Sequence, residues 1–273
     1  MGRLEHLSAT NTPAALAFLE RRPFENVYVY WLIASGQIGR GGEFVIWRDT
    51  AGEIQGSCYV GSQLVPCTED GAALEAFAER ARRVRTTRMI VGARSAVERL
   101  WLLLRATMPA PSTVRTSQPL YALARESLLF SRADANAGPA TLDELDELTT
   151  NSALMIAGEL GGDPRRTNAD FRGRTARIIE AGWWWRYRVD GQLAFMCNVG
   201  STMPQTSQLQ GVWSPPQMRG HGYAARALGA ICDLLLDRIP TLSLYVNDFN
   251  RSAIALYERV GFARVGEFQT ILF

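Results

Sequence analysis

The stretch Pro215–Ala224 reads PPQMRGHGYA and joins a strand-like run to a helix-like run. Gly220 and Gly222 permit positive φ angles and let a ligand approach the backbone closely. The start of a helix offers unpaired N–H groups and a positive dipole end, which attract anions, and Arg219 adds a permanent charge. The stretch holds no acidic residue. We therefore predict a pyrophosphate-binding loop; the alternative is a tight turn whose glycines only permit close packing.

Composition narrows the classes of protein that use such a loop. The chain has 273 residues, and all 29 of its Lys and Arg positions are arginine. Without lysine it lacks the Walker lysine of P-loop nucleotide hydrolases, the protein-kinase lysine and the Schiff-base lysine of pyridoxal enzymes. With only His6 and His221, neither a histidine-rich metal site nor a Ser-His-Asp triad is expected.

Charge, hydropathy and cysteine usage indicate where the protein works. A net charge of +2 argues against a dedicated nucleic-acid binder. The longest apolar runs, such as Leu100–Leu104, are too short to span a bilayer, and the N-terminus has no apolar signal core. Four scattered cysteines without metal-site spacing are typical of reduced thiols. We expect a cytoplasmic protein with no metal and with neither nucleic acid nor membrane as partner; its oligomeric state is not indicated.

The second half of the chain supplies the elements that position the loop. After a Gly-Pro-containing linker at residues 131–141, Thr141 and Glu144 form a capping box at the start of a helix. Gly261 is expected to cap the last helix, and Asp190-Gly191 to turn a hairpin. The elements predicted after the first helix are a helix at 171–182, the hairpin at 183–200, a strand at 208–213, the glycine loop, a helix over 224–235, a strand at 241–246, a helix at 250–260 and a strand at 264–273.

The first half repeats this order in part. Phe44–Gly61 parallels Trp184–Gly200 in its aromatic start, glycine turn and Val-Gly end, and a helix (72–83), a strand (88–93) and a helix (95–106) follow. The pattern indicates a degenerate internal duplication whose first copy has no glycine loop. We predict a divergent N-terminal α/β domain at 1–132 and a catalytic domain at 139–273. The apolar run Val27–Ile33 is interpreted as core, with an acceptor site or domain interface as the alternative.

Two segments of the second half resemble a known family. VWSPPQMRGHGYAARAL resembles the acetyl-CoA-binding segment of the GNAT superfamily of N-acyltransferases, whose signature Arg219, Gly222 and Ala224 satisfy. LSLYVNDFNRSAIALYERVGF resembles the family's later strand, Asn, helix with Leu-Tyr and closing Gly-Phe. The likeness covers about Thr141 to Phe273, and the layout resembles a two-domain branch. It implies an α+β fold, a mixed and largely antiparallel sheet flanked by helices, with a degenerate GNAT-like first half.

The resemblance also implies roles for individual residues. Acetyl-CoA is the implied cofactor, with its pantetheine arm along β-strand backbone and its pyrophosphate in the loop. Tyr257 matches the general acid that protonates the leaving thiolate, and its alternative is a core tyrosine. Asn250 matches a cofactor-binding position, and its alternative is a plain N-cap. The cofactor-binding positions carried over are Val212, Trp213, Arg219, Gly220, His221, Gly222, Tyr223, Ala224 and Asn250.

The general base does not carry over from the family. Many relatives place a glutamate on the strand before the loop, but this strand has Gln208 and Gln210, neither of which takes a proton. The open substitutes are Glu159, Asp248, the carboxylate of Phe273, or water.

The predicted function is transfer of an acetyl group from acetyl-CoA to a primary amine of a small molecule or peptide. A coenzyme-A-binding regulatory or recognition module is the alternative, and transfer from aminoacyl-tRNA is disfavoured by the near-neutral charge. The acceptor stays open. Acidic residues within Leu142–Glu147 would suit a polyamine or aminoglycoside in the cleft, or are an ordinary helix start. Trp183–Trp185 are interpreted as strand core, with an acceptor pocket as the alternative.

Overall fold

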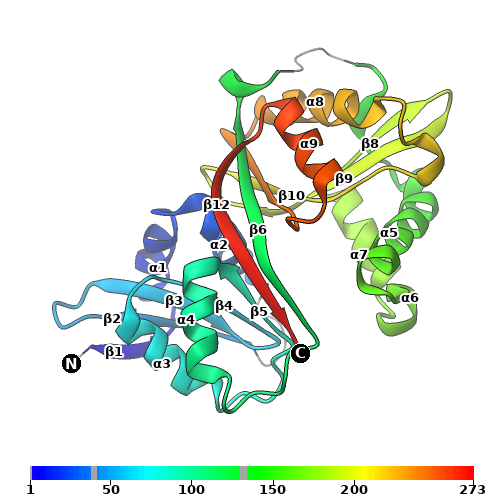
Figure 1. Cartoon of the computed structure of the whole chain (residues 1–273). Coiled ribbons are helices and arrows are strands. Elements are labelled where there is room, and N and C mark those ends of the chain that lie inside the picture. Colours follow the sequence, from blue (N-terminus) through cyan, green and yellow to red (C-terminus); the bar gives the residue numbers. More distant parts are fainter. Residues whose placement is uncertain (1, 38–41, 130–133) are drawn as a thin grey trace.

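A computed structural model describes residues 2–37, 42–129 and 134–273 of the chain (Figure 1). In these ranges one mixed sheet runs through the molecule in the order β1-β2-β3-β4-β5-β12-β6-β11-β10-β9-β8-β7. The pairs β4–β5 and β10–β11 are parallel, and the other neighbours are antiparallel, as predicted. The strands are β1 (Arg3–His6), β2 (Glu43–Arg48), β3 (Ile54–Val60), β4 (Gln63–Cys67), β5 (Met89–Ala93), β6 (Thr113–Ala124), β7 (Ala137–Pro139), β8 (Trp184–Val189), β9 (Gln192–Thr202), β10 (Ser207–Trp213), β11 (Thr241–Tyr245) and β12 (Ala263–Leu272).

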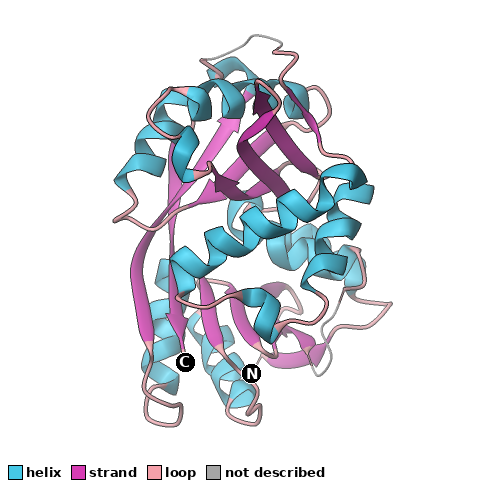
Figure 2. Cartoon of the chain, turned by 90° about the vertical axis from the view of Figure 1, so that its right-hand side faces the viewer, coloured by secondary structure: helices cyan, strands magenta, loops and turns pink. Residues whose placement is uncertain are grey.

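Helices flank this sheet (Figure 2). None in the described ranges is long and apolar enough to cross a membrane. The α-helices are α1 (Thr12–Leu19), α2 (Pro23–Ala34), α3 (Gly71–Ala81), α4 (Arg94–Leu104), α5 (Leu145–Leu160), α6 (Pro164–Thr167), α7 (Phe171–Glu180), α8 (Tyr223–Leu236) and α9 (Arg251–Val260). Short 3₁₀ turns are η1 (Arg125–Ser127), η2 (Leu142–Glu144) and η3 (Pro216–Met218).

The internal duplication is present in the fold. The first half runs β2-β3-β4-α3-β5-α4-β6, and the second half repeats the same order as β8-β9-β10-α8-β11-α9-β12. In each half the third strand and the strand after the helix form the parallel pair. The two copies therefore share one architecture, although only the second carries the glycine loop.

The last strands of the two halves are exchanged. β6, from the first half, pairs with β11 of the second half, and β12 pairs with β5 of the first half. β6 and β12 also pair with each other, and Figure 1 shows them crossing side by side from one half to the other. Of the predicted linker at 131–141, residues 131–133 lie outside the described residues, and Ala137–Pro139 form β7 against β8.

The second half buries a separate layer of side chains on each face of its sheet. Side chains alternate along a strand. Trp185, Phe195 and Leu209 therefore pack against α8 and α9 on one face. Trp184 and Met196 pack against α5 and α7 on the other. The four cysteines are free and buried, as expected of small apolar groups.

Local turn and cap signals take their predicted places. Asp190 and Gly191 have φ values of 48° and 77°, which make the tight turn of the β8–β9 hairpin. Glu144 accepts a hydrogen bond from the Thr141 N–H at 2.9 Å, so the capping box is formed. Gly261 ends α9 with φ 112°.

Replacing Gly261 with alanine is expected to destabilise the fold by more than about 2 kcal/mol. A Cβ at this positive φ would collide with the carbonyl oxygen of Ser127, which is backbone and has no rotamer to change. Gly158 in α5 is the matched control, because a Cβ there meets nothing within 4 Å. Gly158→Ala should stabilise by up to about 1 kcal/mol through helix propensity. Denaturant unfolding measures both, and equal effects would contradict the assignment.

Candidate active site

The loop between β10 and α8 is open and presents backbone N–H groups without a hydrogen-bond acceptor in the described chain. Gly220 and Gly222 take left-handed φ values of 82° and 76°, and a Cβ on either would meet nothing within 4 Å. The N–H groups of residues 220–225 have no hydrogen-bond acceptor within the described part of the chain. The first turn of α8 carries no acidic residue. A row of free N–H groups at the positive end of a helix is suited to phosphate oxygens.

The side chains of this loop lie along its rim. Arg219 Nε donates a hydrogen bond to the Ser214 carbonyl oxygen at 3.0 Å, and its guanidinium lies 5.7 Å from the Trp213 ring centroid. The rings of His221 and Tyr223 stack with centroids 5.5 Å apart. The predicted loop positions Arg219 to Ala224 thus form one continuous segment, separated from Val212 and Trp213 by Ser214, Pro215 and the turn η3.

The strands β10 and β11 separate just before the loop. They pair only at Ser207↔Leu242 and Gln208↔Ser243. Gly211, with φ 60°, then lies in a register shift against β9 where a Cβ would be 2.8 Å from Asn198 Nδ2. An isolated glycine inside a strand pattern signals such a bulge, so Gly211 is a site position that the family motifs did not reveal. Beyond Gln208, β10 pairs with no strand of the described chain on its β11 side.

A cavity of about 630 Å³ opens between the two halves, on the sheet face opposite α8 and α9. We call it the inter-half cavity. Residues of α2, β4 and β5 line one wall, and residues of α7, β9 and β10 line the other. Leu209 faces α8, so its neighbours Gln208 and Gln210 face the cavity beside the gap between β10 and β11.

The three consecutive tryptophans divide between core and cavity. Trp184 and Trp185 are buried, as the core interpretation predicts, whereas Trp183 lines the inter-half cavity. The run Val27–Ile33 divides in the same way: Val27 and Val29 are fully buried, and Tyr28 and Trp31 line the cavity. Tyr245 and Phe268, whose ring centroids are 5.0 Å apart, complete an aromatic wall that sequence motifs did not reveal.

Tyr257 lies on the α9 side of the sheet and is 5 % exposed. Its ring packs 6.3 Å from Tyr121 and 5.9 Å from Phe262, centroid to centroid. Burial raises the pKa of its phenol well above 10, and the neighbouring Cys197 and Glu159 raise the pKa further. Its hydroxyl has no hydrogen-bond partner among the described residues. A buried phenol that stays protonated and makes no hydrogen bond is suited to act as a proton donor. The packing of its ring is equally consistent with a core side chain.

Asn250 caps α9. Its Oδ1 accepts a hydrogen bond from the Ala253 N–H at 3.2 Å and another from Ser252 Oγ at 3.1 Å. The N-cap interpretation therefore holds. The side-chain NH₂ group makes no hydrogen bond among the described residues and keeps the predicted cofactor role open.

The substitutes for a general base lie in three different places. Glu159 is exposed near the end of α5, and its charge acts on the Tyr257 phenol. Asp248 lines a separate cleft with Tyr121 and Glu258. The carboxylate of Phe273 stays an untested option: β12 carries the C-terminus into the first half, where Phe273 packs against Trp101. At about 3.3 Å per strand residue, that end lies roughly 16 Å beyond Phe268, the β12 residue that lines the inter-half cavity described above.

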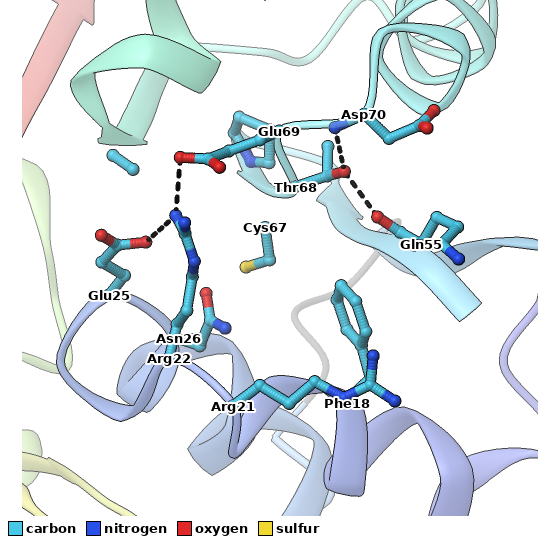
Figure 3. Close-up of a pocket in the computed structure, with 12 residues that line it drawn as sticks. Phe18, Arg21, Arg22, Glu25, Asn26, Gln55, Cys67, Thr68, Glu69 and Asp70 are labelled. Carbon is cyan, nitrogen blue, oxygen red and sulfur yellow. Dashed lines mark hydrogen bonds and ion pairs between the residues drawn. The ribbon is translucent and has the colours of Figure 1, made fainter. Parts of the chain in front are cut away.

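At the corresponding place in the first half, the acidic residues Glu25, Glu69 and Asp70 lie around a smaller pocket (Figure 3). The β4–α3 connection is only Thr68–Asp70, and the Asp70 carboxylate itself accepts from the Ala73 N–H at 2.8 Å. Arg22 Nη1 lies 2.8 Å from Glu69 and 3.1 Å from Glu25. The remaining cavity there is about 200 Å³. A carboxylate already caps this helix start and disfavours a second anion there, so the first copy does not repeat the open arrangement of the β10–α8 loop.

No cluster of three or more His, Cys, Asp and Glu side chains able to hold a metal occurs in residues 2–37, 42–129 and 134–273.

Comparison with known proteins relates both halves to described families. Residues 155–262 match the model of the Acetyltransferase (GNAT) family, and residues 42–148 match that of a domain of unknown function (DUF4081). No curated protein sequence matches the chain.

Solved structures match the chain over its length. An acetyltransferase from the GNAT family from Colwellia psychrerythraea has TM-score 0.62 and 13% identity, over 99% of both chains. A GCN5-related N-acetyltransferase from Sphaerobacter thermophilus has TM-score 0.62 and 16% identity, over 99% of this chain and 94% of that one. A tandem GNAT protein from the clavulanic acid biosynthesis pathway has TM-score 0.60 and 14% identity, over 99% and 98%. The whole chain therefore has the tandem GNAT fold.

Proposed function

We propose, from the premise that residues 155–262 form a GNAT acetyltransferase domain, that this chain transfers an acetyl group from acetyl-CoA to a primary amine. The observation that carries the proposal is that the backbone N–H groups of residues 220–225 have no hydrogen-bond acceptor in the described chain. Two glycines of this segment have left-handed φ values, and the space beside them is open. Each charge-assisted hydrogen bond to a phosphate contributes about 1.5–3 kcal/mol. Such a loop therefore fits the pyrophosphate of coenzyme A.

The gap between β10 and β11 fits the pantetheine arm. Val212 and Trp213 lie where β10 has no partner strand on its β11 side, so their backbone is available for the amide groups of the arm. Arg219, held beside Trp213, adds positive charge next to the loop. The arm would then lead from the loop through the gap to the inter-half cavity, where an acceptor amine has access.

The chain's own groups supply proton transfer and positioning. When bound, acetyl-CoA supplies the thioester, so the amine nitrogen bonds to the acetyl carbon while the carbon–sulfur bond breaks. Tyr257 holds the proton that the leaving sulfur takes, and solvent then reprotonates the phenol. Gln208 and Gln210 orient by hydrogen bonding and accept no proton, so the amine proton passes to water in the cavity.

A coenzyme-A-binding module without catalysis is the second candidate. One observation favours it. Glu25 is the one carboxylate among the described residues that line the inter-half cavity, and Arg22 binds it at 3.1 Å, so no free carboxylate among them serves as the general base. Release of free coenzyme A in the presence of an amine separates the two, because a binding module releases none.

Calorimetric titration with acetyl-CoA tests the site. The unaltered chain should bind, and saturation at 100 times the Kd should raise its stability by about 2.7 kcal/mol. Gly222→Asp, combined with Arg219→Glu, should abolish binding, because two carboxylates would face the pyrophosphate. Gly52→Asp is the matched control: Gly52 also has positive φ, at 86°, and open space, but lies in the first half. No binding by the unaltered chain, or equal binding by the double variant, would overturn the proposal.

A further inference from the structure

The inter-half cavity has one uncompensated charge among its described lining residues, and that charge is positive. Its charged lining residues are Glu25, Arg174 and Arg177. Glu25 is held by Arg22, and Arg177 by Asp170. Arg174 has no ion pair or hydrogen bond from its guanidinium to a described residue, and its charge acts on the neighbouring Tyr28. Glu69, the second partner of Arg22, does not line the cavity, and its side chain is 57 % exposed.

The acidic residues considered for a polycationic acceptor form ion pairs outside the cavity. Glu144 is bound by Arg186 at 3.2 Å and Arg188 at 2.8 Å, and Glu147 also lies on Arg188. None of the acidic residues within Leu142–Glu147 lines the inter-half cavity. A polyamine would therefore bring further positive charge next to Arg174 without a free carboxylate to receive it.

The body of the cavity suits an aromatic molecule. The size of about 630 Å³ is in the range that holds a small organic ligand. Aromatic rings attract one another edge to face or offset, so an aromatic body gains more here than a polar one. The aromatic lining residues are Tyr28, Trp31, Trp183, Tyr245 and Phe268.

Neutral polar groups line the cavity beside the gap between β10 and β11. Ser201 on β9 is 1 % exposed, and its Oγ has no hydrogen-bond partner in the described chain. Ser201 is paired with Gln208 on the neighbouring strand β10. Gln208 is 3 % exposed, lines the same cavity and belongs to the last residue pair between β10 and β11. A buried hydroxyl without a partner costs free energy unless a ligand or water satisfies it. An amine N–H donates to such an oxygen without the repulsion that a second cation would cause.

We propose that the acceptor is a primary amine that carries a carboxylate and an aromatic body, the chemistry of an aromatic α-amino acid. The inference rests on the proposed acetyl transfer. Arg174 binds the carboxylate, the aromatic wall holds the side chain, and Ser201 with Gln208 receives the amine beside the gap. A guanidinium and a carboxylate form two parallel hydrogen bonds, so the single unpaired arginine, Arg174, is suited to bind the single carboxylate of the acceptor.

The test compares coenzyme A release with L-phenylalanine, with phenethylamine, which lacks only the carboxylate, and with spermidine. Phenylalanine should have the highest kcat/KM, about 10-fold above phenethylamine, because an exposed guanidinium is partly screened. Arg174→Gln should remove this preference and leave phenethylamine unchanged. Arg172→Gln is the matched control on α7: its side chain is 61 % exposed, pairs with Asp146 at 2.8 Å and does not line the cavity. It should keep the preference.

The outcomes separate this inference from the proposed function. Faster release with phenethylamine or spermidine would overturn the acceptor class and leave acetyl transfer standing. An equal loss of preference in both arginine variants would overturn the role of Arg174. If the protein binds acetyl-CoA by calorimetry but releases no coenzyme A with phenylalanine, the acceptor class is wrong. If it does not bind acetyl-CoA, the proposed function fails and the inference with it.

Discussion

Replacing Tyr257 with phenylalanine is expected to lower turnover about 10²–10⁴-fold, the usual contribution of a positioned general acid. Acetyl-CoA binding should stay within about twofold, because the change removes one oxygen and no charge. Stability should change little as well, since the Tyr257 hydroxyl has no hydrogen-bond partner among the described residues to leave unsatisfied. Steady-state coenzyme A release, calorimetry and denaturant unfolding measure the three quantities separately.

Tyr121→Phe is the matched control for this experiment. Tyr121 belongs to the same core, its ring lies 6.3 Å from that of Tyr257, and its hydroxyl donates to Glu258 at 3.0 Å. Its loss should cost about 1 kcal/mol of stability and leave turnover unchanged. If Tyr257→Phe keeps the unaltered rate, or if both variants lose rate equally, Tyr257 is a core side chain and another group protonates the thiolate.

The raised pKa of Tyr257 sets a further condition on the rate. A general acid works only while protonated, so its contribution is present below its pKa and lost as pH rises through it. Burial moves that pKa above the ordinary value of 10. Turnover limited by this phenol should therefore not decline up to about pH 10, apart from losses through unfolding.

The loop and its neighbours were predictable because their chemistry is local in sequence. Strand, turn glycines and helix start follow one another over residues 207–236, so the glycines and the missing acidic residue specify the open loop without long-range information. The caps at Glu144 and Gly261 follow the same logic, since each is decided by backbone within a few residues.

The inter-half cavity was not predictable, because its walls come from distant segments. Tyr28 and Trp31 lie on α2, and Phe268 lies more than two hundred residues later on β12. The run Val27–Ile33 is apolar on all sides, and no helical period separates the residues of the core from those of the cavity. Which face meets the second half depends on tertiary packing alone.

Strand β6 was difficult to predict from the sequence for a different reason. Pro119 interrupts its pattern, and proline usually argues against a central strand. In the structure Pro119 lies one residue beyond the last β6–β11 pair, Leu120↔Tyr245, and its carbonyl still accepts from the Val246 N–H at 3.2 Å. The missing N–H of Pro119 therefore affects only the end of the hydrogen-bonded ladder between β6 and β11. The exchange of β6 and β12 leaves no sequence signal either, since a strand alternates in the same way whichever neighbour it pairs with.

Ending the chain at Phe262, and so deleting β12, is expected to abolish cooperative folding of both halves. Deletion leaves β5 and β6 without their shared neighbour and removes the buried Phe268 and Ile271. Losing two such side chains costs about 4–10 kcal/mol, comparable with the whole stability of a typical domain. Deletion of residues 1–6 is the control, because β1 is an edge strand that pairs only with β2. It should lower the Tm by a few degrees.

Amide hydrogen exchange in β5 tests whether folding of the first half depends on its pairing with β12 from the second half. The deleted residues follow the second-half motif in sequence, so chains with self-contained halves would keep β5 protected after truncation. Exchanged strands predict the opposite: the amides of Met89–Ala93 lose protection, and a peptide of residues 263–273 added in trans restores it. Full protection of β5 in the truncated chain would show that the first half holds its fold alone. Loss and rescue together would mean that the GNAT domain and its degenerate partner fold only as one unit, which keeps the inter-half cavity and the cofactor loop in one fixed relation.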